Sequence, residues 1–185
     1  AQERENDLAK KREKNKNRVK RPLKNALNFE DLKNILESKR SISNGDSVTC
    51  SRDRICIVLL YLFGIRVAEL REITIDQIHG YLKKSAVEIT VGKSTSRVKM
   101  EYVSSEEGRK LLKKYCEADI EKVSTVYGQN SKLVTLSREH LTRRINAYFS
   151  AYGKKVNKTL LSHSCRIAYV TRIVEKFGIE AARQM

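Results

Sequence analysis

The stretch that most constrains how this chain can fold is "SRDRICIVLLYLFG", residues 51–64. From Ile55 onward it is apolar on every side of a helix, and a helix of that kind has to be buried. Gly64 follows the last apolar residue, where a glycine commonly ends a helix because it accepts left-handed backbone. We therefore expect a central core helix that ends at Gly64, with a second short helix at "VAELREI", residues 67–73.

The rest of the chain is mostly helical in pattern. Residues 28–39 combine Asn28 as an N-cap with acidic residues in the first turn and apolar residues at helical spacing. Residues 86–103 change to a period of two on both sides of "GKSTS", which indicates two strands joined by a turn. The predicted fold class is therefore α+β, mainly helical, with one small antiparallel hairpin. Further helices are predicted at 105–123, at 137–155 with Ser137 as the N-cap, and at 162–177.

The charge of the chain indicates a polyanionic partner. Lysine and arginine number 38 against 22 acidic residues, which gives a formal net charge of +16. Nucleic acid is the first candidate, although charge alone leaves ribosomal, heparin-binding and membrane-surface proteins open. Residues 1–22 contain almost no large apolar side chains, so we expect a basic arm there. It is either a disordered end or a linker that follows a phosphate backbone.

Other features narrow the class of protein. No run of about 18 apolar residues occurs, so no transmembrane helix is expected, and no signal peptide opens the chain. The four cysteines are scattered without a C-x-x-C pair, which argues against a zinc site and fits reduced thiols in an intracellular protein. We expect no metal and no other cofactor, because no cluster of carboxylates suggests a two-metal site.

The first candidate for chemistry lies in "LLSHSCRIAYVTRIVEKF", residues 160–177. His163 and Arg166 are three residues apart and fall at the N-terminal end of an apolar helix face. An arginine in the first turn faces the positive end of the helix dipole, which is unfavourable unless an anion is near. A phosphate there would satisfy the arginine, the histidine and the free backbone N–H groups. A local ion pair for Arg166 and a carbonyl partner for His163 are the alternative. The apolar residues of this face are Ile167, Val170, Ile173, Val174 and Phe177.

Two further segments carry charges in unusual places. Arg66 follows the core helix at a junction of core elements, and Glu69 lies three residues on, where it can hold the guanidinium. An ordinary surface Arg–Glu pair is the alternative. Lys93 in "VGKSTSR" lies at the expected hairpin turn, where a lysine is usually solvated. Such a tip can also deliver one ammonium group into a groove as an acid.

The order of these three features resembles the catalytic domain of the tyrosine recombinases, the phage integrase family. "FGIRVAELREI" is similar to the family's first arginine box, and "ITVGKSTSRVKM" to its β-hairpin lysine. "LLSHSCRIAYVTRIVEKFGIEAARQM" is similar to its His-x-x-Arg box and the helix after it, and "ALNFEDLKNILES" to the helix that opens the domain. The resemblance covers about residues 22–185. It implies an integrase-like catalytic domain at 23–185, preceded by a linker at 1–22.

Some positions depart from the family pattern. Ser94 and Thr95 stand where the hairpin often has a glycine, and Ile167 stands where many relatives have a histidine. In the family, a second histidine or tryptophan and then the nucleophilic tyrosine come after the His-x-x-Arg helix, but no tyrosine follows residue 177. We therefore expect the central part of a longer recombinase, without the N-terminal clamping domain and inactive alone. The tyrosines near the box are interpreted as core or surface aromatic residues: Tyr148, Tyr152 and Tyr169.

The resemblance implies site-specific DNA strand cleavage and rejoining through a 3′-phosphotyrosine. Arg66 and Arg166 would clamp the non-bridging oxygens of the scissile phosphate, because a guanidinium binds such oxygens bidentately and keeps its charge. His163 would assist proton transfer or bind a phosphate oxygen, and Lys93 would protonate the leaving 5′-oxygen. Glu69 would orient Arg66.

Double-stranded DNA is the expected partner, without membrane association, and the expected location is intracellular and DNA-associated. The family implies a tetramer on DNA for the full-length protein and a monomer for this chain. A non-catalytic DNA-binding, RNA-binding or ribosomal protein is the alternative, and residue type alone does not exclude type IB topoisomerases or telomere resolvases. Phosphate contacts that set register and salt dependence are expected from the following residues, for which a solvated face is the alternative: Arg143, Arg144, Lys154, Lys155 and Lys158.

Overall fold

The structure is a computed structural model that describes residues 25–38, 47–93 and 96–183. The predicted basic arm at 1–22, hairpin residues 94–95 and the side chain of Lys93 lie outside the described residues. In chain order the elements are α2 (Phe29–Glu37), α3 (Ser47–Phe63), the 3₁₀ helix η1 (Glu69–Glu72), α4 (Ile75–Leu82), β1 (Val87–Lys93), β2 (Ser96–Tyr102), α5 (Glu106–Tyr127), α6 (Arg138–Lys155), α7 (Ser162–Phe177) and α8 (Ile179–Arg183).

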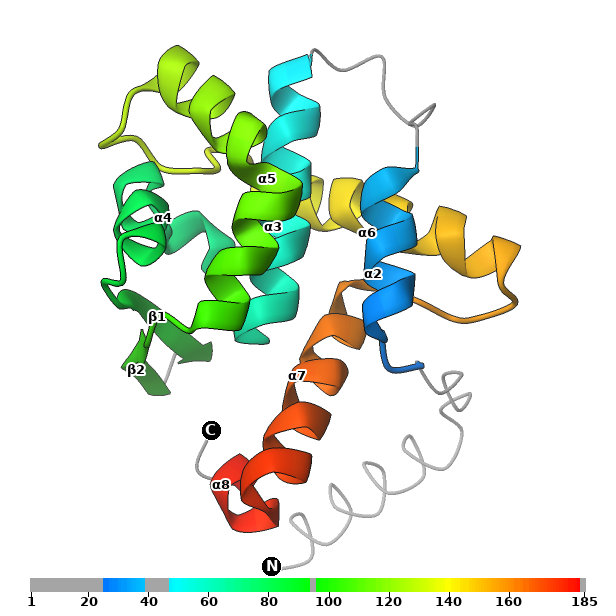
Figure 1. The fold of residues 1–185 in the computed structure, drawn as a ribbon. Helices are drawn as coiled ribbons and strands as arrows, with labels where there is room; N and C mark the ends of the chain where they lie inside the picture. The colour runs from blue at the N-terminus through cyan, green and yellow to red at the C-terminus, as the bar shows by residue number, and fades with distance from the viewer. Residues whose placement is uncertain (1–24, 39–46, 94–95, 184–185) are drawn as a thin grey trace, which may run out of the picture.

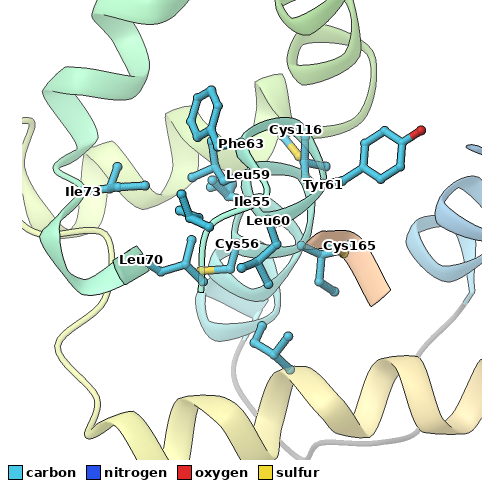
Figure 2. Packing of buried hydrophobic residues seen from close by; sticks show 14 of the residues in the cluster. Ile55, Cys56, Leu59, Leu60, Tyr61, Phe63, Leu70, Ile73, Cys116 and Cys165 are labelled. Atoms are coloured by element: carbon cyan, nitrogen blue, oxygen red, sulfur yellow. The ribbon is translucent and has the colours of Figure 1, made fainter. Parts of the chain in front are cut away.

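Helix α3 is the centre of the core. Every residue of the stretch 55–60 is buried, and α5 and α7 pack against the helix (Figure 1). Figure 2 shows the α3 side chains among residues of these neighbours, including Cys116 of α5 and Cys165 of α7. Burying each such aliphatic side chain contributes about 1.5–3 kcal/mol. The predicted core helix is confirmed, and Gly64 follows it with a φ of 61°.

The helix starts that were predicted from capping residues are confirmed. Asn28 accepts a hydrogen bond from the backbone of Asp31, whose carboxylate accepts one from the backbone of Asn28. Ser137 caps α6 by accepting from the backbone N–H of His140. The predicted fold class is also confirmed, because the described residues are mainly helical with one two-stranded antiparallel sheet. No helix within the described ranges is long and apolar enough to cross a lipid bilayer.

The segment after α3 differs from the prediction. Residues 67–73 contain only the short 3₁₀ helix η1, and helix α4, which was not predicted, follows at once. Thr74 caps α4 through a capping box with Gln77. Residues 128–133 run beside this junction, with a bridge from Thr74 to Lys132 and a hydrogen bond from the Leu133 N–H to the Ile73 carbonyl. These long-range contacts hold α4 in place, and a local hydrophobic pattern cannot predict them.

The predicted hairpin is confirmed, and its register determines what it presents to the core. Val87 pairs with Tyr102, Ile89 with Met100 and Val91 with Val98, so these side chains share one face. Lys93 pairs with Ser96 next to the turn. Strand β1 packs against η1 and α4, which places Gly92 of this strand beside the segment that carries Arg66 and Glu69.

Helix α7 has the predicted bounds, but the predicted orientation of its faces is wrong. The apolar stripe that was expected to face the core is only half-buried, and its last residue, Phe177, is 62% exposed. His163 is exposed, and Arg166 is half-buried. The helix packs instead through small residues on its other side, because small side chains let α7 lie close to α3. These buried residues are Ser164, Cys165 and Ala168.

Candidate active site

A cleft lies where the end of α3, the hairpin and α7 meet. Arg66 and Arg166 both line it, although they are far apart in the sequence. The fold therefore brings two guanidinium groups to one hollow, a setting that suits an anion. The complete lining is Phe63, Gly64, Arg66, Val91, Gly92, Met100, Tyr102, Arg166, Tyr169 and Val170.

A buried carboxylate holds Arg66 in place. The side chain of Glu69 is 6% exposed, and its Oε1 lies 3.0 Å from Nη1 of Arg66. Its Oε2 also accepts the backbone N–H of Arg66 at 2.6 Å. The predicted orienting contact from Glu69 to Arg66 is present in this geometry. Within the described residues, the other guanidinium N–H groups of Arg66 have no hydrogen-bond acceptor, so they are available to a ligand.

The same carboxylate also anchors the hairpin. Oε1 of Glu69 accepts the backbone N–H of Gly92 at 3.1 Å. Gly92 directly precedes Lys93, so one buried group ties the Arg66 turn to the strand that carries the predicted lysine. A local sequence pattern does not predict this contact, because it depends on the way β1 packs against η1.

Arg166 is positioned by the segment that precedes Arg66. Its Nη1 donates to the carbonyl oxygen of Gly64 at 3.0 Å. The ring of Tyr169, one turn further along α7, lies directly over Gly64, where an added Cβ would be 2.4 Å from a ring carbon. Gly64 thus lets α7 come close enough for Arg166 to reach its carbonyl, and both arginines are placed relative to one short stretch of backbone.

The other two predicted catalytic residues are placed less directly. His163 lies one turn before Arg166 at the exposed start of α7, and it does not belong to the residues that line the cleft. The backbone of Lys93 adjoins Gly92 at the cleft, while its side chain lies outside the described residues. The structure therefore brings Arg66, Glu69 and Arg166 together, with the hairpin strand beside them.

The sequence model of the phage integrase family matches residues 25–182. This chain belongs to the phage integrase family. The match includes both arginine segments and the hairpin, and the family consists of site-specific recombinases that act on DNA. No curated protein matches the chain.

Two of the five basic residues that are predicted to touch DNA form ion pairs with buried carboxylates of the integrase core. Nη2 of Arg144 lies 2.7 Å from Oδ2 of Asp53, and Nζ of Lys158 lies 2.8 Å from Oδ2 of Asp31. The two carboxylate side chains are only 4% and 5% exposed. A buried carboxylate needs such a partner, so these two cations have a structural role. The three remaining residues are exposed: Arg143, Lys154 and Lys155.

Two tyrosines of the integrase cleft were missed as site residues. Tyr102 and Tyr169 line the cleft with both arginines. Burial raises the pKa of Tyr102 to about 12, with smaller effects from Tyr169 and Glu69, and burial also raises the pKa of Tyr169. The sequence pattern alone predicts only a core or surface aromatic residue at Tyr169. The sequence holds a hint for each tyrosine. Tyr102 shares a strand face with Met100, and Tyr169 follows Arg166 by one helical turn, so both could have been predicted to lie near the site.

Within the described ranges, no group of three or more histidine, cysteine, aspartate or glutamate side chains is arranged to hold a metal ion. The cations of the described cleft are the two guanidinium groups. What this cleft can do is bind a phosphate through fixed donors.

Proposed function

We propose that this chain provides the phosphate-binding catalytic part of a site-specific recombinase, which cleaves and rejoins DNA through a 3′-phosphotyrosine. The observation that carries the proposal is the convergence of Arg66 and Arg166 on one cleft. A nucleic-acid-binding protein without this chemistry has no need for two guanidiniums from distant segments over one hollow. The membership of the phage integrase family supports the same conclusion.

The two arginines stabilise the transition state of the phosphoryl transfer. Negative charge develops on the non-bridging oxygens as a tyrosine oxygen attacks phosphorus and the 5′-oxygen leaves. Each arginine uses one Nη1 for a protein contact, to Glu69 or to the Gly64 carbonyl, and keeps other N–H groups for the phosphate. One preorganised donor of this kind is worth about 2.7–4 kcal/mol in the transition state.

Lys93 and His163 carry the proton transfers in this proposal. Lys93 lies on the strand that Glu69 anchors at Gly92, and its ammonium group protonates the leaving 5′-oxygen. His163, one turn before Arg166, hydrogen-bonds a phosphate oxygen or assists the proton transfer. Glu69 is a positioning residue, because it acts through Arg66 and through the hairpin backbone.

The attacking tyrosine comes from outside this cleft. The pKa values of Tyr102 and Tyr169 are raised by burial, which makes their phenolate forms rarer rather than commoner. We expect the 185 residues alone to bind DNA as a monomer and to form no covalent adduct. The full-length recombinase supplies the nucleophile and acts as a tetramer on two DNA duplexes. Arg143, Lys154 and Lys155 contribute exposed phosphate contacts.

The test is a covalent-adduct assay with the full-length recombinase on nicked DNA that carries its recombination site. We expect Arg166→Ala to abolish the protein–DNA adduct while most DNA binding remains. Lys113→Ala is the control, because Lys113 is exposed on α5, lies outside the cleft and has no proposed role in DNA binding, and it should leave the adduct yield intact. An unchanged yield in Arg166→Ala would refute the role of the cleft.

A further inference from the structure

We propose that the hydroxyl groups of Tyr102 and Tyr169 bind the phosphodiester in the cleft, as two neutral hydrogen-bond donors beside Arg66 and Arg166. This inference rests on the phosphate chemistry proposed above and adds two ligands to it. The two tyrosines come from β2 and α7, so the binding group is complete only when the hairpin and the helix are both in place.

Packing fixes both rings, and therefore the positions of both hydroxyls. The ring of Tyr102 lies against Phe63 at 4.8 Å between centroids, and Tyr102 is only 9% exposed. The ring of Tyr169 lies over Gly64, where there is no room even for a methyl group. Rings held in this way keep their donors in place before a ligand arrives, which lowers the entropy cost of binding.

The hydroxyls are suited to donate. Tyr169 adds to the rise in the pKa of Tyr102, and the Arg166 guanidinium acts to lower the pKa of both tyrosines. Their pKa values are raised chiefly by burial, so both groups are protonated at neutral pH. Among the residues that the structure describes, neither hydroxyl has a hydrogen-bond partner. Neither hydroxyl belongs to the fully buried unpartnered atoms of the described residues, so both remain accessible to a ligand in the cleft that offers acceptor oxygens.

The charges around the cleft favour an anionic acceptor. Glu69, the carboxylate that acts on Tyr102, already accepts hydrogen bonds from Arg66 and Gly92. Its negative charge is therefore offset by the guanidinium. A phosphodiester offers two charged non-bridging oxygens, each of which accepts more than one hydrogen bond. Two guanidiniums and two hydroxyls together match those acceptors.

The experiment is an NMR titration of the 185-residue chain, labelled with ¹³C at the tyrosine Cζ atoms, with dimethyl phosphate as the smallest phosphodiester. The Cζ signals of Tyr102 and Tyr169, assigned from their Tyr→Phe variants, should shift with one common Kd. Each Tyr→Phe change should raise that Kd about tenfold, because it removes one hydrogen bond to a charged acceptor. These changes remove only an oxygen atom, so the fold is retained.

Tyr127→Phe is the matched control, since Tyr127 is 41% exposed at the end of α5 and does not line the cleft. It should leave the Kd unchanged. If Arg66→Ala and Arg166→Ala weaken binding but the Tyr102 and Tyr169 variants do not, the tyrosine inference is wrong and the arginine cleft stands. If dimethyl phosphate does not bind saturably, or if the arginine variants have no effect, both proposals are wrong.

Discussion

Gly64→Ala should destabilise this integrase-family chain and disturb its cleft for one structural reason. Gly64 has a φ of 61°, where a residue with a Cβ pays about 1–2 kcal/mol. The new Cβ would also lie 2.4 Å from Cδ1 and 2.7 Å from Cβ of Tyr169, so α7 or the ring has to move. Overpacking of this kind costs about 1–3 kcal/mol. The expected loss in unfolding free energy is therefore about 2–5 kcal/mol.

Gly128→Ala separates the two contributions. Gly128 also has a positive φ, 83°, but an added Cβ would meet only Ser131 Oγ, at 3.9 Å. Gly128 has a φ of 83° and a ψ of 153°, a combination that only glycine adopts readily, so this control carries a backbone strain of about 1–3 kcal/mol without the clash. Urea unfolding of both variants compares the two losses, and we expect Gly64→Ala to lose about 1–2 kcal/mol more.

The same pair of variants tests the link to function. Because the Gly64 carbonyl holds Arg166, a shift of α7 also changes the spacing of the two arginines. Dimethyl phosphate should bind more weakly to Gly64→Ala than to Gly128→Ala. If the two variants agree to within about 0.5 kcal/mol in stability and bind the diester equally, the close contact does not position the cleft.

Three other predictions follow from buried charged or titratable groups. Glu69→Ala should speed amide hydrogen exchange in the hairpin about tenfold, measured by mass spectrometry, because the β1 backbone loses its carboxylate anchor; equal rates would show that the anchor is dispensable. The pKa of Tyr102 is raised from 10.0 to about 12, so its contribution to stability is full below pH 10 and is lost as pH rises toward 12. Between pH 10 and 12 the unfolding free energy of Tyr102→Phe should therefore fall less steeply with pH than that of the unchanged chain. The two slopes should differ by at most about 1.4 kcal/mol per pH unit. Arg144→Ala should lower the unfolding free energy, measured with urea, by about 2–4 kcal/mol, because it leaves the buried carboxylate of Asp53 without its cation. The control is Arg143→Ala at the exposed neighbouring residue, which should change the unfolding free energy by under about 0.5 kcal/mol.

The predictions that succeeded depended on local patterns. The run of apolar residues at 55–60 predicted a buried helix, Asn28 and Ser137 marked helix starts, and the period of two around residue 92 predicted the hairpin. Each of these signals is complete within a few residues of the chain. The order of the arginine, lysine and His-x-x-Arg segments was likewise sufficient to predict the family.

The predictions that failed depended on neighbours that are distant in sequence. The apolar stripe of α7 was a sound amphipathic pattern, yet the helix packs through Cys165 and Ala168, because close approach to α3 favoured small side chains. Helix α4 was missed because residues 128–133 help to fix it. The ion pairs of Arg144 with Asp53 and of Lys158 with Asp31 could not be predicted either, because each joins segments that are distant in sequence.

By itself the sequence determined which residues carry charge beside core segments, and it predicted the helix before Arg66, the hairpin that carries Lys93 and the helix that carries Arg166. Only the tertiary structure decided that Glu69 joins the Arg66 turn to the hairpin, that Arg166 reaches the Gly64 carbonyl, and that the two arginines share a cleft. The reason is physical: secondary structure follows from interactions within a few residues, whereas a site that binds one phosphate requires groups from distant segments to be held together by packing.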